Sequence, residues 1–366
     1  MAMATAGGSD LAPASLHEKV ALLSQAATYG PGVTAVEAVE THMSLLFLAG
    51  PTVYKLKKPV VYPFLDFSTL TARERSCRDE LRLNRRLAPD VYLGLSTITR
   101  EADGSLALDG RGRIEDWLVR MRRLPSGGTL DRMIAAGHLG ADRVDAVAAV
   151  LARFYRIAER GRLTADEYVE QLRSEHAVNR EVLCSFESHA TAPLLEEVQR
   201  FLDEDRALLR ARVDVGRIVD GHGDLRPEHI WLNGPPVIID CLEFNERLRQ
   251  VDVFDEISYL GLECARLGAP WVGPRLVQVL SAALDDEVDP RLLAFYSRYR
   301  ACVRARLALA HLAEPGPREP GRWQPLAREY LRLGAQFSPA PSAPSSRHPS
   351  ANTAPPGRTA APPARS

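Results

Sequence analysis

Short hydrophobic segments separated by turn residues fill the first third of the chain. Strand-forming residues gather at 36–39, 43–48, 53–57, 91–98 and 114–121. Segments of this length, divided by glycine, proline and aspartate turns, are typical of antiparallel strands. A helical repeat of leucine and valine comes before them, over 16–27. The pattern therefore predicts a lead-in helix followed by a small antiparallel sheet.

A helix is predicted between the third and fourth of these strands. Thr71 and Glu74 match a capping box, and a proline at position 89 ends the helical pattern at about residue 88. Glu80 lies on the same helical face as Leu83 and Leu87, so its carboxylate is expected to point inward with them. A buried carboxylate needs a cation, because an unpaired buried charge costs several kcal/mol.

Two lysines on the third strand are candidates for that cation. Lys55 and Lys57 are two residues apart and therefore face the same side of a strand. We favour Lys55 as the partner of Glu80, and expect Lys57, which begins a Lys-Lys-Pro exit, to be solvated. The alternative is that Glu80 lies at the edge of the apolar stripe and pairs with an arginine of its own helix, at 73, 82 or 85.

From about residue 129 the hydrophobic period becomes helical. Helical spacing covers 130–136, 143–160, 165–186, 193–213, 251–260, 291–312 and 323–333. No internal repeat is evident. The order of elements predicts an α+β protein in which a sheet-containing lobe precedes a mainly helical one, with the boundary at the glycine-containing turn 125–128.

One stretch in the helical half breaks this pattern. Residues 230–232 and 237–239 have the character of two short strands around a reversing turn at 233–236. Asp224 precedes this hairpin and Asp240 follows it, so both carboxylates are expected to point into one space. Two convergent carboxylates are suited to a divalent cation and a phosphate.

The run His222-Gly223-Asp224 and the later pair Ile239-Asp240 resemble the catalytic and metal loops of the protein-kinase-like fold, in the form used by the aminoglycoside phosphotransferase family. The resemblance implies a small antiparallel β N-terminal lobe over 16–125 and a mainly helical C-terminal lobe over 126–335. It also implies transfer of the γ-phosphoryl group of ATP to a hydroxyl of a small molecule, with Mg²⁺ or Mn²⁺ as cofactor.

The resemblance implies a role for each residue of the central stretch. Asp224 would orient and deprotonate the acceptor hydroxyl, and Arg226 would reach the γ-phosphate. Asp240 would bind the metal, with His229 and Glu243 as further candidate ligands. His229 departs from the family pattern, in which asparagine follows five residues after the aspartate. An imidazole suits manganese, zinc or iron better than magnesium.

Residues outside that stretch have implied roles as well. Lys55, held by Glu80, would bind the nucleotide phosphates, and the backbone of the strand at Trp117 and Val119 would meet adenine. Three residues would support the catalytic loop, namely His222, Asp252 and Asp255. The region between the first two strands has no glycine-rich phosphate loop, so side chains or other backbone groups would have to cover the phosphates. No Gly-x-x-x-x-Gly-Lys-Ser/Thr motif occurs, which disfavours a P-loop enzyme.

His229 leaves other functions open. The first alternative is a pseudokinase that binds nucleotide without transferring phosphate. The second is a metal-dependent phosphoesterase that uses His222, Asp224, His229 and Asp240, which would require His222 to face the metal. Nucleotidyl transfer to a protein is a third. The family resemblance does not fix the acceptor, although Glu243, Glu246, Asp252 and Asp255 favour a polar or cationic one.

Composition narrows the class of protein. The chain has 366 residues, 45% of them hydrophobic, and a net charge of −1, which gives no reason to expect a nucleic-acid or membrane-surface partner. Its five cysteines form no Cys-x-x-Cys pair, and neither a signal peptide nor an apolar run of about 18 residues is apparent. We therefore expect a cytoplasmic protein with disordered tails at 1–15 and 336–366. The oligomeric state is left open.

The runs 53–59 and 64–69 look like an uncharacterised bacterial branch of the family, in some members of which a P-loop kinase domain follows.

Overall fold

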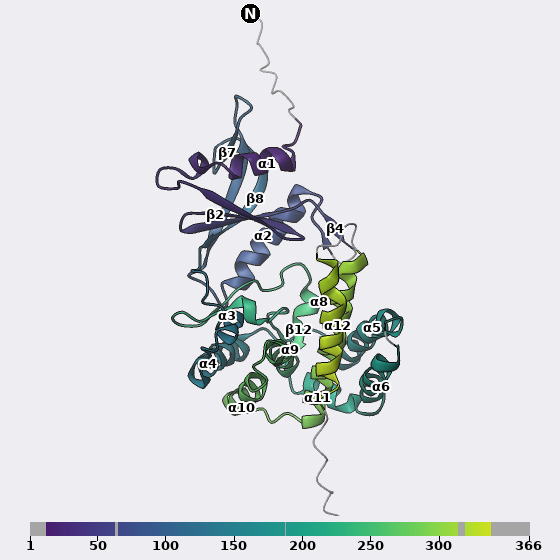
Figure 1. Ribbon diagram of the computed structural model, residues 1–366. Coiled ribbons are helices and arrows are strands. Elements are labelled where there is room, and N and C mark those ends of the chain that lie inside the picture. The colour runs from purple at the N-terminus through teal and green to yellow at the C-terminus, as the bar shows by residue number, and fades with distance from the viewer. Residues whose placement is uncertain (1–11, 63–64, 187, 314–318, 338–366) are drawn as a thin grey trace, which may run out of the picture.

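The computed structural model describes residues 12–62, 65–186, 188–313 and 319–337, arranged as a sheet-containing lobe above a helical lobe (Figure 1). This arrangement confirms the predicted α+β architecture. The two predicted tails lie largely outside the described residues. Within the first of them, Ala14 is buried and its N–H donates to the Glu115 carboxylate at 2.7 Å, so the ordered chain begins before the first helix.

A single antiparallel sheet of six strands forms the N-terminal lobe, in the order β1-β2-β3-β8-β6-β7. The strands are β1 (Val36–Glu40), β2 (Ser44–Ala49), β3 (Thr52–Lys57), β6 (Tyr92–Arg100), β7 (Leu106–Leu108) and β8 (Arg113–Arg122). The predicted strands are all present, and β7 is an additional short edge strand. A separate two-stranded hairpin, β4 (Val61–Tyr62) with β5 (Leu65–Asp66), precedes the second helix.

The two faces of the sheet pack against different helices. Side chains alternate across a strand, so Leu118 belongs to the cluster that includes Leu23 of α1 (Leu16–Leu23), whereas Val119 belongs to the cluster that includes Cys77 of α2 (Leu70–Asn84). A short 3₁₀ turn, η1 (Ala26–Tyr29), follows α1. Figure 1 shows α1 and α2 on either side of the sheet, with α2 between it and the helical lobe.

The start of α2 differs from the sequence-based expectation. The N-cap is Thr69, whose side-chain oxygen accepts the Ala72 N–H at 3.1 Å. The predicted capping box at Thr71 and Glu74 is therefore wrong. Both threonines are compatible with an N-cap, and the earlier one is used because the chain enters the helix directly from the β4–β5 hairpin.

Helices make up most of the C-terminal lobe and surround one large hydrophobic core. They are α3 (Leu130–Ala135), α4 (Ala141–Ile157), α5 (Ala165–Cys184), α6 (Ser188–Glu204), α7 (Arg206–Asp214), α8 (Glu246–Arg249), α9 (Val253–Arg266), α10 (Val272–Leu284), α11 (Pro290–Ala310), the 3₁₀ turn η3 (His311–Ala313) and α12 (Pro320–Gly334). The helix expected over 193–213 is two helices, broken at Asp205, and α10 was not anticipated.

Short strands position the central stretch inside this helical lobe. The strand β9 (Ile218–Asp220) pairs with β12 (Gln250–Asp252), and the 3₁₀ turn η2 (Pro227–His229) leads into the hairpin of β10 (Ile230–Trp231) and β11 (Val237–Ile238). The predicted hairpin is thus confirmed, with Ile230 opposite Ile238.

The connection between the lobes lies against this hairpin. The Leu232 N–H donates to the Gly128 carbonyl at 2.7 Å, and the Trp231 indole N–H donates to the Pro125 carbonyl at 3.3 Å. A side chain at Gly128 would lie 2.4 Å from the Trp231 indole nitrogen, so only glycine allows the connecting segment to approach this closely.

Among the described residues, no helix is long and apolar enough to cross a bilayer.

Candidate active site

The predicted pairing of Lys55 with Glu80 is confirmed, and it extends to Asp240. The Lys55 ammonium of β3 lies 2.8 Å from Glu80 Oε1 on α2 and 2.9 Å from Asp240 Oδ1 in the helical lobe. Lys55 lowers the pKa of Asp240 well below its usual range. Burial lowers the pKa of Lys55, but the carboxylates of Asp240 and Glu80 outweigh burial, and the pKa of Lys55 is raised. Lys55 and Asp240 are therefore both charged at neutral pH.

Lys57 is buried, and the expectation that it is solvated is wrong. Its side chain is 1% exposed, and its ammonium lies 2.6 Å from Glu80 Oε2 and 2.5 Å from Glu243 Oε1. The ring of Phe67 is a further neighbour, at 5.2 Å. The Lys-Lys-Pro exit suggested exposure, but the inward face of β3 continues one step beyond Lys55 and α2 covers it. Glu80 therefore binds two lysines.

The Asp224 carboxylate is held between a guanidinium and a phenol. Arg226 Nε lies 3.1 Å from this carboxylate, and the Tyr259 hydroxyl donates to its Oδ1 at 3.1 Å. Burial raises the pKa of Asp224, but the charge of Arg226 and the other basic groups around the carboxylate together outweigh burial, and the pKa is lowered. Asp224 is therefore ionised at neutral pH. Its side chain is 30% exposed, which leaves room for a ligand to reach it.

His229 lies between the two acids and brings them into one site. Its Nε2 accepts from Arg226 Nη2 at 3.1 Å, because arginine can only donate. Its Nδ1 therefore carries the proton and donates to the Asp224 carbonyl at 2.9 Å. The same Nε2 lies 3.6 Å from Asp240 Oδ2. The Asp224 carboxylate lies on the other side of the ring, with Oδ2 3.9 Å from Nδ1, so both carboxylates lie beside His229, as expected.

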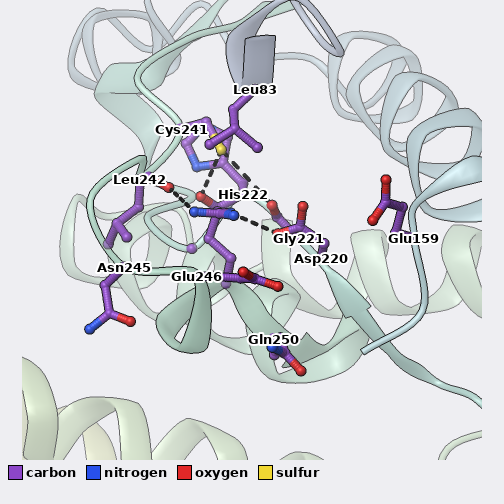
Figure 2. A network of polar contacts seen from close by, with 12 residues as sticks. Leu83, Glu159, Asp220, Gly221, His222, Cys241, Leu242, Asn245, Glu246 and Gln250 are labelled. Atoms are coloured by element: carbon purple, nitrogen blue, oxygen red, sulfur yellow. Dashed lines mark hydrogen bonds and ion pairs between the residues drawn. The ribbon is translucent and has the colours of Figure 1, made fainter. Parts of the chain in front are cut away.

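His222 is a buried scaffold residue. Its Nε2 donates to the Ile239 carbonyl at 2.9 Å, and its Nδ1 accepts the Asp224 N–H at 3.3 Å. Burial lowers the pKa of His222, so the ring is neutral. Figure 2 shows Cys241 and Leu242 beside His222, where the Cys241 thiol and the Leu242 N–H donate to the His222 carbonyl at 3.2 and 3.0 Å. Both ring nitrogens are occupied, so His222 does not face a metal.

The carboxylate that supports the loop 221–226, which the resemblance predicts to be the catalytic loop, is Glu256. Sequence reasoning missed this residue. It accepts the His222 N–H at 3.0 Å, the Gly223 N–H at 2.6 Å and the Tyr155 hydroxyl at 2.7 Å. Asp255, the neighbouring residue on α9, binds Arg300 through two hydrogen bonds of 2.6 Å.

Asp252 does not contact the catalytic loop through its side chain either. It lies 2.5 Å from Arg212 and caps α9 by accepting the Phe254 N–H. The supports expected at Asp252 and Asp255 are therefore corrected to Glu256. The only signal in the sequence was the presence of several acids in the first turn of α9, and this does not say which of them turns toward the loop.

The expected adenine contacts at Trp117 and Val119 are wrong. β8 is a central strand, and Val119 lies opposite Lys55 on one side and Leu95 on the other, so its backbone groups face neighbouring strands. The Trp117 carbonyl accepts the Cys77 thiol of α2. The strand β8 continues to Arg122. The segment 123–128 leaves the sheet and reaches the helical lobe.

The segment after Asp240 is tied to the N-terminal lobe by its backbone as well. The Asp240 N–H donates to the Tyr92 hydroxyl at 3.1 Å, and the Cys241 N–H donates to Asn84 Oδ1 at 2.8 Å. Asp240 has φ of 61°, in the left-handed region that is uncommon outside glycine, so these bonds hold a strained backbone. Strain of this kind is concentrated at functional sites.

Asp240 and His229 are the side chains that could hold a divalent cation. Among the described residues, no group of three or more His, Cys, Asp or Glu side chains is arranged to hold a metal ion. Asp240 is 47% exposed and supplies a carboxylate oxygen, with His229 Nε2 at 3.6 Å. Mg²⁺ is commonly bound by one or two carboxylates together with substrate phosphates, so this set fits a cation that arrives with a nucleotide. Glu243 is engaged by Lys57.

No family model matches this chain. An uncharacterised protein of Mycobacterium tuberculosis is 33% identical to it over 289 residues, which cover 77% of this chain and 56% of that protein. An uncharacterised protein of Mycobacterium bovis has the same identity and coverage. The chain therefore spans about half the length of these relatives.

Solved structures show the fold. A choline/ethanolamine kinase family protein from Mesorhizobium loti covers 88% of this chain and 95% of its own length, with a TM-score of 0.52 and 13% identity. An aminoglycoside phosphotransferase in a ternary complex with AMP-PNP and hygromycin B covers 86% and 99%, with a TM-score of 0.48 and 12% identity. The first of these likenesses confirms the predicted two-lobe kinase-like fold, which this chain shares with the choline/ethanolamine kinase family protein.

Proposed function

We propose that this protein is an ATP-dependent phosphotransferase acting on a hydroxyl of a small molecule. The observation that carries the proposal is the position of Lys55. It comes from the sheet of one lobe and binds both Glu80 and Asp240, while His229 connects Asp240 to Asp224. A kinase-like phosphotransferase needs this combination of a lysine, a metal-binding acid and a second acid for the acceptor.

Asp224 is the group for the acceptor. It is ionised and partly exposed, and the bonds from Arg226 and Tyr259 hold its orientation. A carboxylate in this state can accept a hydrogen bond from a hydroxyl, direct the oxygen toward phosphorus and take the proton as the bond forms. The arrangement accounts for orientation and proton removal with one side chain.

Lys55 is the group for the nucleotide phosphates. Its ammonium lies on the helical-lobe side of the sheet, and Glu80 keeps it charged and directed there. Arg226 supplies a second cation next to Asp224, suited to an oxygen of the transferred group. For the base we propose the segment 123–128 in place of Trp117 and Val119, because it leaves the sheet at the junction of the lobes.

A divalent cation would be held by Asp240, with His229 Nε2 as the nearest second donor. Magnesium or manganese bound there would neutralise charge on the phosphates. Glu243 is not proposed as a ligand, because its Oε1 binds the Lys57 ammonium and the Ser76 hydroxyl of the N-terminal lobe.

His229 favours a second candidate, a nucleotide-binding protein without transfer activity. Arg226 donates to both Asp224 and His229, and this network partly blocks the two groups that transfer would need. The phosphoesterase alternative is not supported, because both ring nitrogens of His222 are bonded within the protein.

The experiment is incubation of the protein with ATP labelled in the γ-phosphate, magnesium or manganese, and an extract of small metabolites. A labelled product that the Asp224→Asn variant does not form is the expected result. Thermal stabilisation by ATP without labelled product would favour the second candidate. Unchanged transfer by Asp224→Asn would remove this residue from the mechanism.

A further inference from the structure

The unusual feature of the site is a second buried lysine on the same carboxylate. Lys55 binds one oxygen of Glu80 at 2.8 Å and Lys57 binds the other at 2.6 Å. Glu80 is 0% exposed and Lys57 1%, whereas Lys55 is 14% exposed. Lys55, which is partly exposed, contacts Asp240, and Lys57, which is buried, contacts Glu243. The two lysines therefore have different surroundings although they are adjacent on one face of β3.

The second lysine keeps Glu80 paired when the first lysine moves. A fully buried carboxylate without a cation strongly destabilises the folded protein. A lysine that is the only partner of such a carboxylate therefore cannot turn toward a ligand without a large loss of stability. With Lys57 bound to one oxygen, Glu80 keeps a cation when the Lys55 ammonium moves. Lys55 is then free to exchange its contact with Asp240 for a contact with phosphate.

Lys57 also connects the two lobes. Its bond to Glu243 joins β3 to the segment that begins at Asp240, and the Ser76 hydroxyl of α2 lies 3.4 Å from the same carboxylate oxygen. Two backbone bonds from this segment reach the N-terminal lobe, at Tyr92 and Asn84. The position of the Asp240 carboxylate is thus set from the sheet-containing lobe.

We propose that Lys57 is a positioning residue for phosphoryl transfer. It neutralises Glu80 so that Lys55 can serve the nucleotide, and it fixes the Asp240 segment through Glu243. This inference rests on the proposed function. It assigns a role to the lysine that the sequence had placed in solvent, and it makes Glu243 part of a link between the lobes.

The test compares Lys57→Met, Glu243→Gln and the double variant with wild-type protein. Lys58→Met is the matched control, because Lys58 is the next residue, its side chain is also largely buried at 14% exposed, and its ammonium pairs at 3.0 Å with Glu40 and not with Glu80. Thermal melts first establish a temperature at which every variant is folded. Steady-state transfer from ATP is then measured as a function of ATP and of magnesium concentration.

A positioning role predicts at least a tenfold loss of kcat/KM for ATP in Lys57→Met, with more magnesium needed for half-maximal rate. Glu243→Gln should show part of the same loss. The double variant should lose less than the product of the two single effects, because both remove one link. Lys58→Met should stay within twofold of wild type.

A purely structural role would lower the melting temperature and leave kcat/KM of the folded protein unchanged, and that result overturns the inference. If wild-type protein transfers no phosphate, the proposed transfer activity is refuted, and binding of a fluorescent ATP analogue with magnesium replaces the rate. Weaker binding by Lys57→Met than by Lys58→Met then supports the inference that Lys57 lets Lys55 serve the nucleotide. Failure of wild-type protein to bind the analogue overturns the proposed function together with this inference.

Discussion

Replacing Glu256 with glutamine should loosen the catalytic loop without changing the size of the side chain. The Glu256 carboxylate accepts from the backbone N–H groups of His222 and Gly223 and from the Tyr155 hydroxyl. These are charge-assisted bonds, each worth about 1.5–3 kcal/mol against about 0.5–1.5 for neutral ones. The variant keeps the oxygen that accepts both backbone N–H groups but loses the charge, and its NH₂ group has to donate to the Tyr155 hydroxyl instead of accepting from it. Each of the three bonds therefore weakens by roughly 1 kcal/mol.

The three weakened bonds together predict a loss of about 3 kcal/mol in the free energy of unfolding. Urea unfolding followed by tryptophan fluorescence measures this quantity. The matched control is Glu246→Gln, because Glu246 is 56% exposed and lies 3.7 Å from Arg162. Such surface pairs contribute about 0–1 kcal/mol, so the control should unfold close to wild type. Equal stability of the two variants would refute the assignment of Glu256 as the support of the loop.

Three further predictions concern other residues. Asp224→Asn should lower the phosphoryl transfer rate by about 10²–10⁴-fold, the usual contribution of a general base, with an unchanged circular dichroism spectrum; a rate within tenfold of wild type would contradict it. Burial lowers the pKa of His176 to about 4, so the ring is neutral in the folded protein. The stability that this gives is fully present above the ordinary histidine pKa of about 6.5, and the free energy of unfolding should fall as the pH drops from there toward 4. His176→Gln should lack this pH dependence when urea unfolding is measured at several pH values. Arg86→Met should lower the free energy of unfolding by about 2 kcal/mol, because Arg86 donates to the carbonyls of residues 220 and 221. Arg82→Met, at a side chain that is 61% exposed, should change the free energy of unfolding by less than about 0.5 kcal/mol. Similar values for both variants would show that the Arg86 bonds do not contribute to stability.

Local patterns predicted the elements well where one face is buried. The strand segments around 43–48 and 114–121 and the hairpin at 230–239 are present, because short runs of strand-forming residues bounded by turn residues are typical of strands. The side-chain periods of a strand and a helix placed Lys55 and Glu80 toward each other. Errors occurred where two local signals competed, as at the start of α2, where both Thr69 and Thr71 can cap a helix and only the preceding hairpin decides.

The sequence by itself determined which side chains share a face, and so it indicated the acids of the site and the lysine of the sheet. Apart from the Lys55–Glu80 pair, only the tertiary structure decided which charges meet. Lys57 and Glu243 are 186 residues apart, and Glu256 reaches the catalytic loop while its neighbour Asp255 turns to Arg300. Spacing along a helix or strand fixes only the directions in which the side chains of that element point. The partner of a buried charge depends on how the lobes pack, because burial makes pairing obligatory without specifying the partner.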